Sequence, residues 1–491
     1  MTKTILCRAD GNSKVGLGHL YRMLAIAAFY KDSYELVFLT KECSTSEVIP
    51  KDFSLSFIPK GISILEEPQW ISNNFSSSDY IIIADGYQFT TNFQKEIKKH
   101  GFTLIYIDDL AEQKMYADVV VNHSPYSMLE HYNAEKYTQF AIGVSYSMLR
   151  PLFNEAAKTE RIITNIDSAF VCFGGADQYD LSLKATKALL NIEKFNNIEV
   201  VLGAAYRGEE IFKLEKNNNK LTLHKNLDES RLCSLMSSCN FAVVPSSTIL
   251  YEICSVKIPV LSGYYVDNQK YIYNGLLNKN VFFKGEDFSK YKVLDFEDKI
   301  KSILTINKLD VYTKNQQNLF QGNSKINFLG LLNRLNVSFR KATKDDLMLV
   351  YNWSNDPLVR NNSFNSEPIV LNQHRNWFAT KIKDANTLFL IALVNNKPAG
   401  IIRYSIEDKY SLVSIMISKA FRGQKLAETF LKKSSVLYFK IEDKPVLAYI
   451  KNENIASVKA FENSGYQYFK EELIKNKISF LYKLNKKDVR E

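Results

Sequence analysis

Short apolar runs that end in polar residues recur along the first two thirds of the chain and alternate with amphipathic stretches. Clear examples are residues 36–40, 79–85, 103–109 and 118–122. Such runs are typical of buried parallel strands, which carry functional groups at their carboxyl ends. Strands that alternate with helical segments predict a doubly wound α/β architecture.

The order of strand, glycine-containing turn and helix occurs twice, and it divides this region into two Rossmann-like halves. We expect these halves at residues 1–155 and 156–330, joined by a crossing near residues 146–158. From Val337 the order changes to strand, helix, a meander of strands and a second helix, which predicts an α+β domain over residues 337–491. A chain of 491 residues is too long for one hydrophobic core, so several domains are expected.

Charge and cysteine usage limit the class of partner. The formal net charge of +10 favours anionic partners, although a lysine-rich surface without a special partner explains it equally well. No basic run resembles a nucleic-acid-binding arm, and no window approaches the roughly 20 apolar residues of a membrane span. The N-terminus lacks the signal-peptide pattern, and the six cysteines lack CxxC spacing. We therefore expect a cytoplasmic protein that binds small molecules and has no nucleic-acid, membrane or metal partner.

Gly16, Gly18 and His19 stand between the first expected strand and the first expected helix. Glycine lets a ligand approach the backbone closely, and the free N–H groups of a helix N-terminus favour an anionic ligand. An imidazole at this position can accept a proton from water at neutral pH. The spacing by itself leaves open a purely structural turn with an exposed histidine.

The residues around this turn complete a longer pattern. Together with Arg8, Asp10 and Arg22, the turn resembles the N-terminal signature of the UDP-sugar hydrolases of pseudaminic acid biosynthesis. That family belongs to the GT-B-like group, which also holds the MurG-type glycosyltransferases. The resemblance implies that His19 is the base that activates water at the anomeric carbon. It also implies a catalytic role for Asp10 and a substrate-binding role for Arg22 and the two glycines.

Further tracts match the same family in the same order along the chain. They are Asp85-Gly86-Tyr87, Asp108-Asp109 and the inter-domain segment at residues 146–153. The resemblance implies that Tyr87 is catalytic and that Arg150 contacts the substrate.

In the second half, glycines, hydroxyls and amides occupy the positions at which the family binds UDP. The candidates are Gly174, Gly175, Ser247, Thr248, Glu252, Asn268 and Gln269. Bare glycine backbone suits contact with a diphosphate, and Glu252, one helical turn after Thr248, can hold ribose hydroxyls. Pro245 and Ser246 stand where many relatives have two glycines, which changes one backbone contact. Without the resemblance, an ordinary βα turn and a solvated Glu252 explain the same residues.

The third domain contains a strand, a loop and a helix start that resemble the coenzyme A pyrophosphate loop of GNAT-family N-acetyltransferases. The expected acetyl-CoA-binding residues are Ile415, Ile417, Arg422, Gly423, Gln424, Lys425, Leu426, Ala427 and Asn454. Successive N–H groups at a helix start suit a pyrophosphate. Lys425 stands where the pattern has a glycine, and its N–H can donate if the residue keeps an ordinary conformation.

The acceptor side of this domain is less clearly marked. Phe461 stands where many relatives have the tyrosine that protonates the leaving thiolate, so Tyr466 or Tyr468 is a candidate acid. Trp353 and Arg360 resemble the acceptor-site residues of GNAT subgroups that act on 4-amino nucleotide sugars. Core packing is the alternative for Trp353 and both tyrosines.

The two resemblances imply one bifunctional enzyme. Its expected reactions are acetyl-CoA-dependent N-acetylation of the 4-amino group of a UDP-4-amino-4,6-dideoxy sugar, and hydrolysis of UDP-2,4-diacetamido-2,4,6-trideoxy-β-L-altropyranose to free sugar and UDP. Acetyl-CoA is the only expected co-substrate, and no metal is expected. The alternatives are a GT-B glycosyltransferase, a hydrolase for another diamino sugar, a different acyl donor, and a UDP-sugar-binding protein with an inactive acetyltransferase domain.

Overall fold

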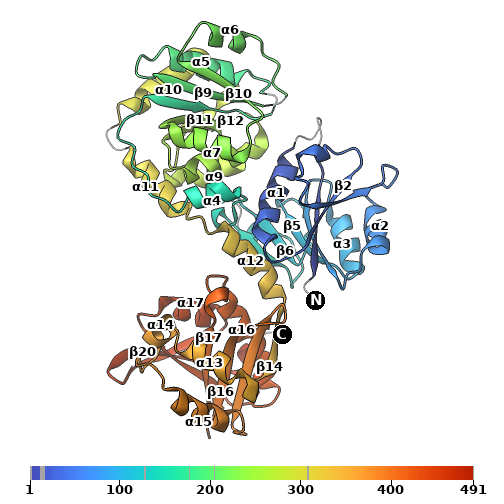
Figure 1. The fold of residues 1–491 in the computed structure, drawn as a ribbon, viewed down its shortest axis with the longest axis vertical. Coiled ribbons are helices and arrows are strands. Elements are labelled where there is room, and N and C mark those ends of the chain that lie inside the picture. The colour runs from blue at the N-terminus through green and yellow to red at the C-terminus, as the bar shows by residue number, and fades with distance from the viewer. Residues whose placement is uncertain are drawn as a thin grey trace. The chain divides into compact units, whose positions relative to one another are not determined.

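The computed structural model describes residues 3–11, 17–126, 129–175, 177–203, 205–306 and 309–489. The chain forms two compact units, residues 2–328 and residues 329–491 (Figure 1). We call residues 2–328 the two-lobe unit and residues 329–491 the C-terminal unit.

The first lobe is built on a parallel sheet of seven strands in the order β3-β2-β1-β4-β5-β6-β7. Its strands are β1 (Thr4–Ala9), β2 (Leu36–Lys41), β3 (Ser54–Ile58), β4 (Tyr80–Asp85), β5 (Thr103–Ile107), β6 (Val119–Asn122) and β7 (Gln139–Ile142). Its helices are α1 (Gly18–Tyr30), α2 (Glu67–Asn74) and α3 (Thr91–Lys99). The strand order reverses between β1 and β4, and in such sheets the crevice at that point is where ligands bind.

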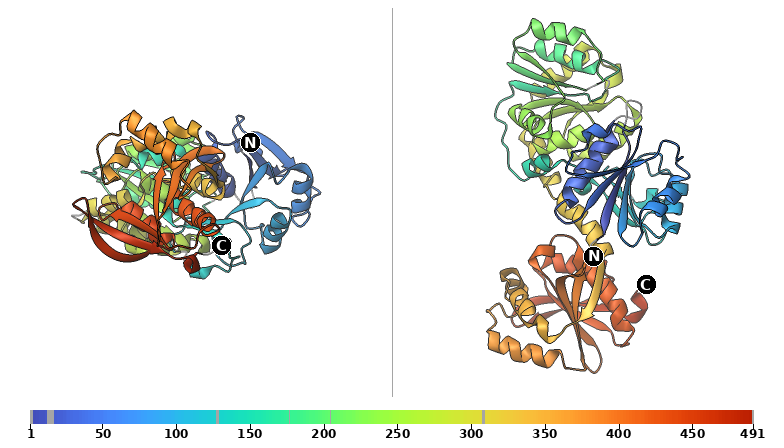
Figure 2. Two further views of the ribbon diagram at one scale, coloured as in Figure 1. Left: turned by 90° about the horizontal axis from the view of Figure 1, so that it is seen from below. Right: turned by 45° about the vertical axis from the view of Figure 1, so that its right-hand side comes forward.

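The second lobe repeats this plan with six parallel strands in the order β10-β9-β8-β11-β12-β13. Its strands are β8 (Ser168–Val171), β9 (Asn197–Leu202), β10 (Leu221–Lys225), β11 (Phe241–Pro245), β12 (Val260–Tyr264) and β13 (Phe283–Asp287). Its helices are α5 (Leu181–Leu190), α6 (Glu210–Lys216), α7 (Glu229–Ser238), α8 (Thr248–Ser255), α9 (Asp267–Leu276) and α10 (Val293–Leu304). Figure 1 and Figure 2 show helices on both faces of these sheets, so the prediction of two Rossmann-like, GT-B-like halves is confirmed.

Two connections hold the lobes together. The chain crosses from the first lobe to the second through α4 (Pro151–Ala156), and it returns through α11 (Asp310–Leu319) and α12 (Ser324–Leu335). On the return, the Tyr30 hydroxyl donates to the Phe328 carbonyl at 2.6 Å, and the Asn327 amide donates to the Ser145 carbonyl at 2.8 Å. These contacts attach the end of the second lobe to the first.

The C-terminal unit has a mixed sheet in the order β14-β15-β16-β17-β18-β20-β19. Its strands are β14 (Val337–Lys341), β15 (Thr387–Val394), β16 (Lys397–Ile406), β17 (Ser411–Ile417), β18 (Val446–Lys451), β19 (Gln467–Ile474) and β20 (Lys477–Leu484). Its helices include α13 (Leu347–Ser354), α14 (Pro357–Asn362), α15 (Leu371–Lys381), α16 (Leu426–Phe439) and α17 (Ile455–Asn463). One apolar cluster joins the sheet to α16, and a second one on the other face joins it to α13 and α15. The predicted α+β domain is confirmed.

One pair of strands in this sheet separates along its length. β17 and β18 run parallel and pair at Ser411↔Val446 and Leu412↔Leu447. No further pair joins these two described strands, so residues 413–417 of β17 have no partner on that side.

Among the described residues, no helix is both long enough and apolar enough to cross a bilayer.

Candidate functional site

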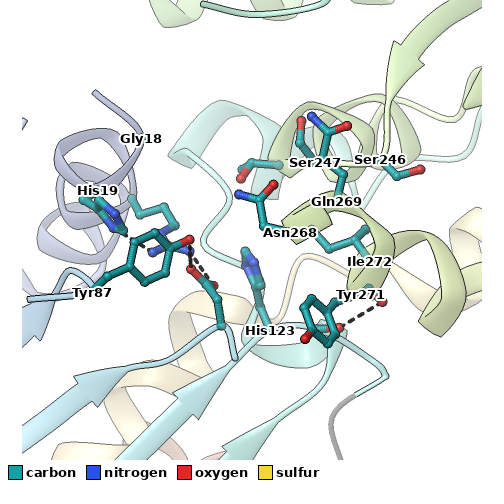
Figure 3. Close-up of a pocket in the computed structure, with 14 residues that line it drawn as sticks. Gly18, His19, Tyr87, His123, Ser246, Ser247, Asn268, Gln269, Tyr271 and Ile272 are labelled. Atoms are coloured by element: carbon teal, nitrogen blue, oxygen red, sulfur yellow. Dashed lines mark hydrogen bonds and ion pairs between the residues drawn. The ribbon is translucent and has the colours of Figure 1, made fainter. Parts of the chain in front are cut away.

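A cavity of about 240 Å³ in the two-lobe unit is lined by residues from both lobes (Figure 3). The first lobe contributes Gly18, His19, Arg22, Tyr87, Asp109, His123 and Ser124, and the second contributes Ser246, Ser247, Thr248, Asn268, Gln269, Tyr271 and Ile272. Eight of these residues were expected from the sequence, and the fold brings them together from positions up to 251 residues apart, Gly18 to Gln269. Gly16 lies outside the described residues.

His19 is oriented by a buried carboxylate. Its Nδ1 lies 2.7 Å from Oδ1 of Asp85, whose side chain is fully buried at the carboxyl end of β4. Because a carboxylate only accepts hydrogen bonds, Nδ1 carries the proton and donates a hydrogen bond to Asp85. Nε2 of His19 is then left with a lone pair. The arrangement is that of a general base held in one tautomer by a third group.

Arg22 bridges the carboxylates of Asp85 and Asp109 next to this imidazole. Its guanidinium donates to Asp85 at 2.5 and 2.9 Å and to both oxygens of Asp109 at 2.7 and 2.9 Å. Nη2 of Arg22 also lies 2.9 Å from Nδ1 of His19. Both groups are donors there, so this contact is proximity only, and each donates to Asp85. Burial raises the pKa of Asp109, but the charge and hydrogen bonds of Arg22 outweigh it and lower that pKa to about 2.

Two carboxylates and one guanidinium surround the His19 imidazole. Two carboxylates against one guanidinium leave one net negative charge beside the ring. Such a charge stabilises the imidazolium that forms when a histidine takes a proton from water. Most of the donor capacity of Arg22 is used inside the cluster, and its predicted role in substrate binding stays a prediction.

Tyr87 closes the cluster on its solvent side. Its hydroxyl donates to Oδ2 of Asp109 at 3.2 Å, and its ring meets the His19 ring edge-on at 5.0 Å. Burial and the charge of Asp109 raise the pKa of Tyr87 to about 12. The hydroxyl is therefore a protonated donor at neutral pH.

His123 is a site residue that the sequence analysis missed. It follows β6 directly and is 3% exposed, and burial lowers its pKa to about 4, so the ring is neutral at pH 7. Its Nδ1 is buried and has no hydrogen-bond partner among the described residues. The ring packs against Tyr251 of the second lobe at 5.2 Å, and Figure 3 shows it between the His19 cluster and Asn268. The available signal was its position directly after an apolar strand.

Two helix N-termini of the second lobe reach the cavity. Ser247 precedes α8, whose first residue is Thr248, and Asn268 and Gln269 lie in the first turn of α9. The free N–H groups and positive dipole ends of helix starts favour an anionic ligand. The Ser246 hydroxyl hydrogen-bonds the Ser262 hydroxyl at 2.9 Å. The side chain that replaces a glycine of the expected pattern is therefore satisfied inside the second lobe.

Asp10 lies away from the cavity lining. Its carboxylate accepts from Arg8 at 2.7 Å and from the Thr40 hydroxyl and Lys41 N–H at 2.9 and 2.8 Å. Burial raises the pKa of Asp10, and the hydrogen bonds and charge of Arg8 more than offset this, so the net shift is downward. In this structure Asp10 joins β1 to β2, and its catalytic role stays a prediction.

Four expected UDP-binding residues are also absent from the cavity lining. Arg150 and Glu252 pair with each other at 2.8 Å. Gly174 and Gly175 form an exposed turn whose carbonyls lie against Gly203, where a side chain would have no room. The roles of these residues in binding UDP stay predictions.

In the C-terminal unit, the loop before α16 has two left-handed residues, Gly423 at φ 80° and Lys425 at φ 57°. The condition set for Lys425, an ordinary backbone conformation, is therefore not met. A left-handed conformation costs a side-chain-bearing residue about 1–2 kcal/mol. Strain of this size persists where the surrounding structure imposes it, commonly at functional loops.

The neighbours of this loop hold it in place. Arg422 donates to Asp356 at 2.9 Å and to the Ile417 carbonyl at 3.1 Å. Gln424 is 6% exposed and accepts a hydrogen bond from Asn333. Leu426 and Ala427 begin α16, and Ile415 and Ile417 lie in the part of β17 that has no partner strand on the side of β18.

The remaining expected residues of this unit are engaged inside it. Asn454 caps α17 by accepting from the Ser457 N–H at 3.2 Å. Tyr466 is 3% exposed, and its hydroxyl lies 3.5 Å from that of Ser435. Arg360 donates to three backbone carbonyls, the nearest of them that of Ser354 at 2.6 Å. Trp353 packs in the apolar cluster under α13 and α15. Their roles with acetyl-CoA or its acceptor stay predictions.

Residues 336–467 match the family model described as the acetyltransferase (GNAT) domain. Residues 336–467 therefore form a GNAT-like acetyltransferase domain, which follows the two Rossmann-like lobes in the sequence.

Three relatives match parts or most of the chain. An uncharacterized protein of Methanocaldococcus jannaschii is 24% identical over 93% of this chain and 95% of its own length. The UDP-2,4-diacetamido-2,4,6-trideoxy-beta-L-altropyranose hydrolase of Campylobacter jejuni is 25% identical over 54% of this chain and 93% of its own length. The spore coat polysaccharide biosynthesis protein SpsG of Bacillus subtilis is 22% identical over 53% of this chain and 77% of its own length.

Similar solved structures include two acetyltransferases. Spermidine N-acetyltransferase of Vibrio cholerae, in complex with CoA and spermine, is 14% identical over 32% of this chain and 98% of that chain, with a TM-score of 0.30. AAC(6')-Ib, in complex with ribostamycin and coenzyme A, is 14% identical over 31% of this chain and 95% of that chain, with a TM-score of 0.29.

Proposed function

We propose that the two-lobe unit hydrolyses a UDP-sugar, UDP-2,4-diacetamido-2,4,6-trideoxy-β-L-altropyranose, to free sugar and UDP. The observation that carries this proposal is the His19–Asp85 pair, which faces two helix N-termini across one cavity. A base on one side and an anion-binding surface on the other are what hydrolysis of a sugar diphosphate requires. The Campylobacter jejuni hydrolase, which matches about half of this chain, supports the same reaction.

The reaction follows from these groups. A water molecule gives one proton to Nε2 of His19 as its oxygen attacks C1 of the sugar. The bond between C1 and the diphosphate oxygen breaks, and UDP leaves with the electron pair. Asp85 stabilises the imidazolium, and the starts of α8 and α9 stabilise the departing diphosphate. A positioned base typically contributes about 10²–10⁴-fold to such a rate.

The C-terminal unit, in the same proposal, transfers the acetyl group of acetyl-CoA to the 4-amino group of a UDP-4-amino-4,6-dideoxy sugar. The GNAT match supports the transfer itself. The co-substrate would lie where strands β17 and β18 separate, next to the start of α16. The amine forms a C–N bond with the acetyl carbonyl carbon and the C–S bond of the thioester breaks. The proton lost by the amine ends on the departing sulfur, so coenzyme A leaves as the thiol. Two consecutive activities on one chain raise the local concentration of the shared intermediate.

A single variant separates the two activities. His19→Ala should stop UDP release from the diacetamido nucleotide sugar and leave acetyl transfer unchanged, with both products followed by NMR. His224→Ala is the matched control, because His224 lies on β10 and pairs with Glu199 instead of lining the cavity. UDP release by His19→Ala at the wild-type rate would refute the hydrolytic mechanism. UDP release that requires an added sugar acceptor would identify a glycosyltransferase instead.

A further inference from the structure

Arg403 of the acetyltransferase domain has no carboxylate partner among the described residues. It lies in the middle of β16, opposite Phe389 of β15 and Ser414 of β17. Phe389 belongs to the apolar cluster under α13 and α15, so Arg403 extends to that face of the sheet. Its guanidinium lies 5.2 Å from the centre of the Trp377 ring. Its Nε is buried and has no hydrogen-bond partner in the part of the chain that the structure describes.

Other partly or fully buried arginines are paired. Carboxylates hold Arg8, Arg22, Arg150, Arg340 and Arg422, and backbone carbonyls hold Arg161, Arg334 and Arg360. Burial lowers the pKa of Arg403, and no described carboxylate offsets this cost. A desolvated charge without a partner destabilises the fold, and a bound anion would offset this desolvation penalty.

The surroundings of Arg403 suit a ligand better than a packed core. Trp377 offers a partly exposed aromatic face, and the ring of His374, 5.2 Å from Trp377, has a buried Nε2 without a partner among the described residues. Ser414, across the strand from Arg403, is exposed. The face around Arg403 therefore combines one cation, an aromatic ring and the exposed hydroxyl of Ser414.

The position along β17 connects this face to acetyl transfer. Ser414 and Met416 point to the same face, because side chains two residues apart in a strand share a side. Both lie in the stretch of β17 that no longer pairs with β18. The loop expected to hold the phosphates of acetyl-CoA, residues 422–425, comes after the end of this strand. An anion held at Arg403 thus belongs to a second ligand, whose remaining atoms can extend along β17.

We propose that Arg403, with Trp377 as its platform, binds a phosphate of the UDP-linked acetyl acceptor and is a specificity-determining residue for it. This inference rests on the proposed acetyl transfer and adds the residues that recognise the diphosphate of the acceptor.

Steady-state acetyl transfer to two acceptors tests the proposal. The acceptors are a UDP-4-amino-4,6-dideoxy sugar and the same 4-amino sugar without UDP, with thiol release as the signal. Arg403→Gln should raise KM for the UDP-linked acceptor by about tenfold or more and leave KM for acetyl-CoA and for the free sugar unchanged. Arg403→Lys should recover part of the loss, since it keeps the charge. Arg375→Gln is the matched control, because Arg375 is exposed on α15.

Other outcomes of this experiment overturn the inference. An unchanged KM for the UDP-linked acceptor, or an equal loss with both acceptors, means that Arg403 does not bind the phosphate. A raised KM for acetyl-CoA assigns Arg403 to the co-substrate.

A binding measurement keeps the inference separate from the proposed function. If the wild-type chain acetylates neither sugar, the proposed acetyl transfer fails, and quenching of tryptophan fluorescence by UDP still tests the site. The relevant signal is the part of the quenching that Trp377→Phe removes. Its loss in Arg403→Gln and its persistence in Arg375→Gln would support the phosphate site. Equal quenching in wild type and Arg403→Gln would overturn it.

Discussion

Nδ1 of His19 lies 2.7 Å from a carboxylate oxygen of Asp85, although 66 residues separate the two in the chain. The contact exists because β1 pairs with β4 in the first sheet, which places the start of α1 beside the carboxyl end of β4. This contact places the proton of the His19 ring on Nδ1.

Replacement of Asp85 should slow UDP release, because the His19 ring would lose its fixed tautomer. In Asp85→Asn, the amide no longer requires the proton on Nδ1, and the negative charge that stabilises the imidazolium is lost. We expect the kcat for UDP release to fall by about 10²–10⁴-fold. Acetyl transfer by the same variant serves as the internal control. A kcat within twofold of wild type would show that His19 does not depend on Asp85.

His123 should make stability depend on pH in a defined window. Its pKa is about 4 in the folded chain and close to the ordinary value of 6.5 when unfolded, so the unfolded chain binds the extra proton first. The free energy of unfolding should therefore fall as pH drops from 6.5 to 4. His123→Phe should flatten that decline, as measured by urea unfolding across this range. Asp109, whose folded pKa is about 2, adds its own decline only below about pH 4. An unchanged slope in His123→Phe would contradict the assignment.

Asn268 should contribute to binding of the nucleotide sugar. It lines the cavity in the first turn of α9, where its amide and the helix N–H groups can reach the diphosphate. Hydrogen bonds to charged groups are worth about 1.5–3 kcal/mol, so Asn268→Ala should raise KM for hydrolysis by roughly tenfold or more. Asp267→Asn is the control, because the Asp267 side chain is 94% exposed and pairs with Lys270. Equal effects of both substitutions would indicate a general disturbance of α9.

The end of α12 should influence the loop at residues 422–425, which is expected to hold acetyl-CoA. A Cβ on Gly330 would lie 2.7 Å from the Gln424 carbonyl, and the Asn333 and Arg334 side chains donate to Gln424. Gly330→Ala should favour the helix by about 1 kcal/mol yet raise KM for acetyl-CoA, because the added methyl group displaces the loop. Hydrolysis of the UDP-sugar should stay unchanged. An unaltered KM would show that the loop tolerates the methyl group.

Local sequence patterns were sufficient for the architecture and for part of the site. Alternating apolar and amphipathic stretches predicted the two lobes, because the period of burial is a local property of strands and helices. His19, Thr248 and Asn268 stand at or near helix starts that follow strands, and the resemblance to the UDP-sugar hydrolases marked them as candidates. The loop at residues 422–427 was marked by its resemblance to the GNAT family.

Pairing between distant segments could not be read from these patterns. Asp10 matched a family motif, yet its carboxylate is engaged with Arg8 and β2. His123 carries no motif, and its place in the cavity follows from the position of β6 in the sheet. The left-handed backbone of Lys425 is imposed by the packing of the loop and contradicts the preference of its own residue type.

By itself the sequence determined the strand and helix succession, the division into two lobes and a third domain, and the polar residues at the strand ends, because each of these depends on neighbours in the chain. Only the tertiary structure decided that Asp85 orients His19, that His123 faces Asn268 across the cavity, and that Arg403 has no carboxylate beside it among the described residues. These relationships depend on strand order and on which side chains share a buried volume, and both are set by packing across the whole fold.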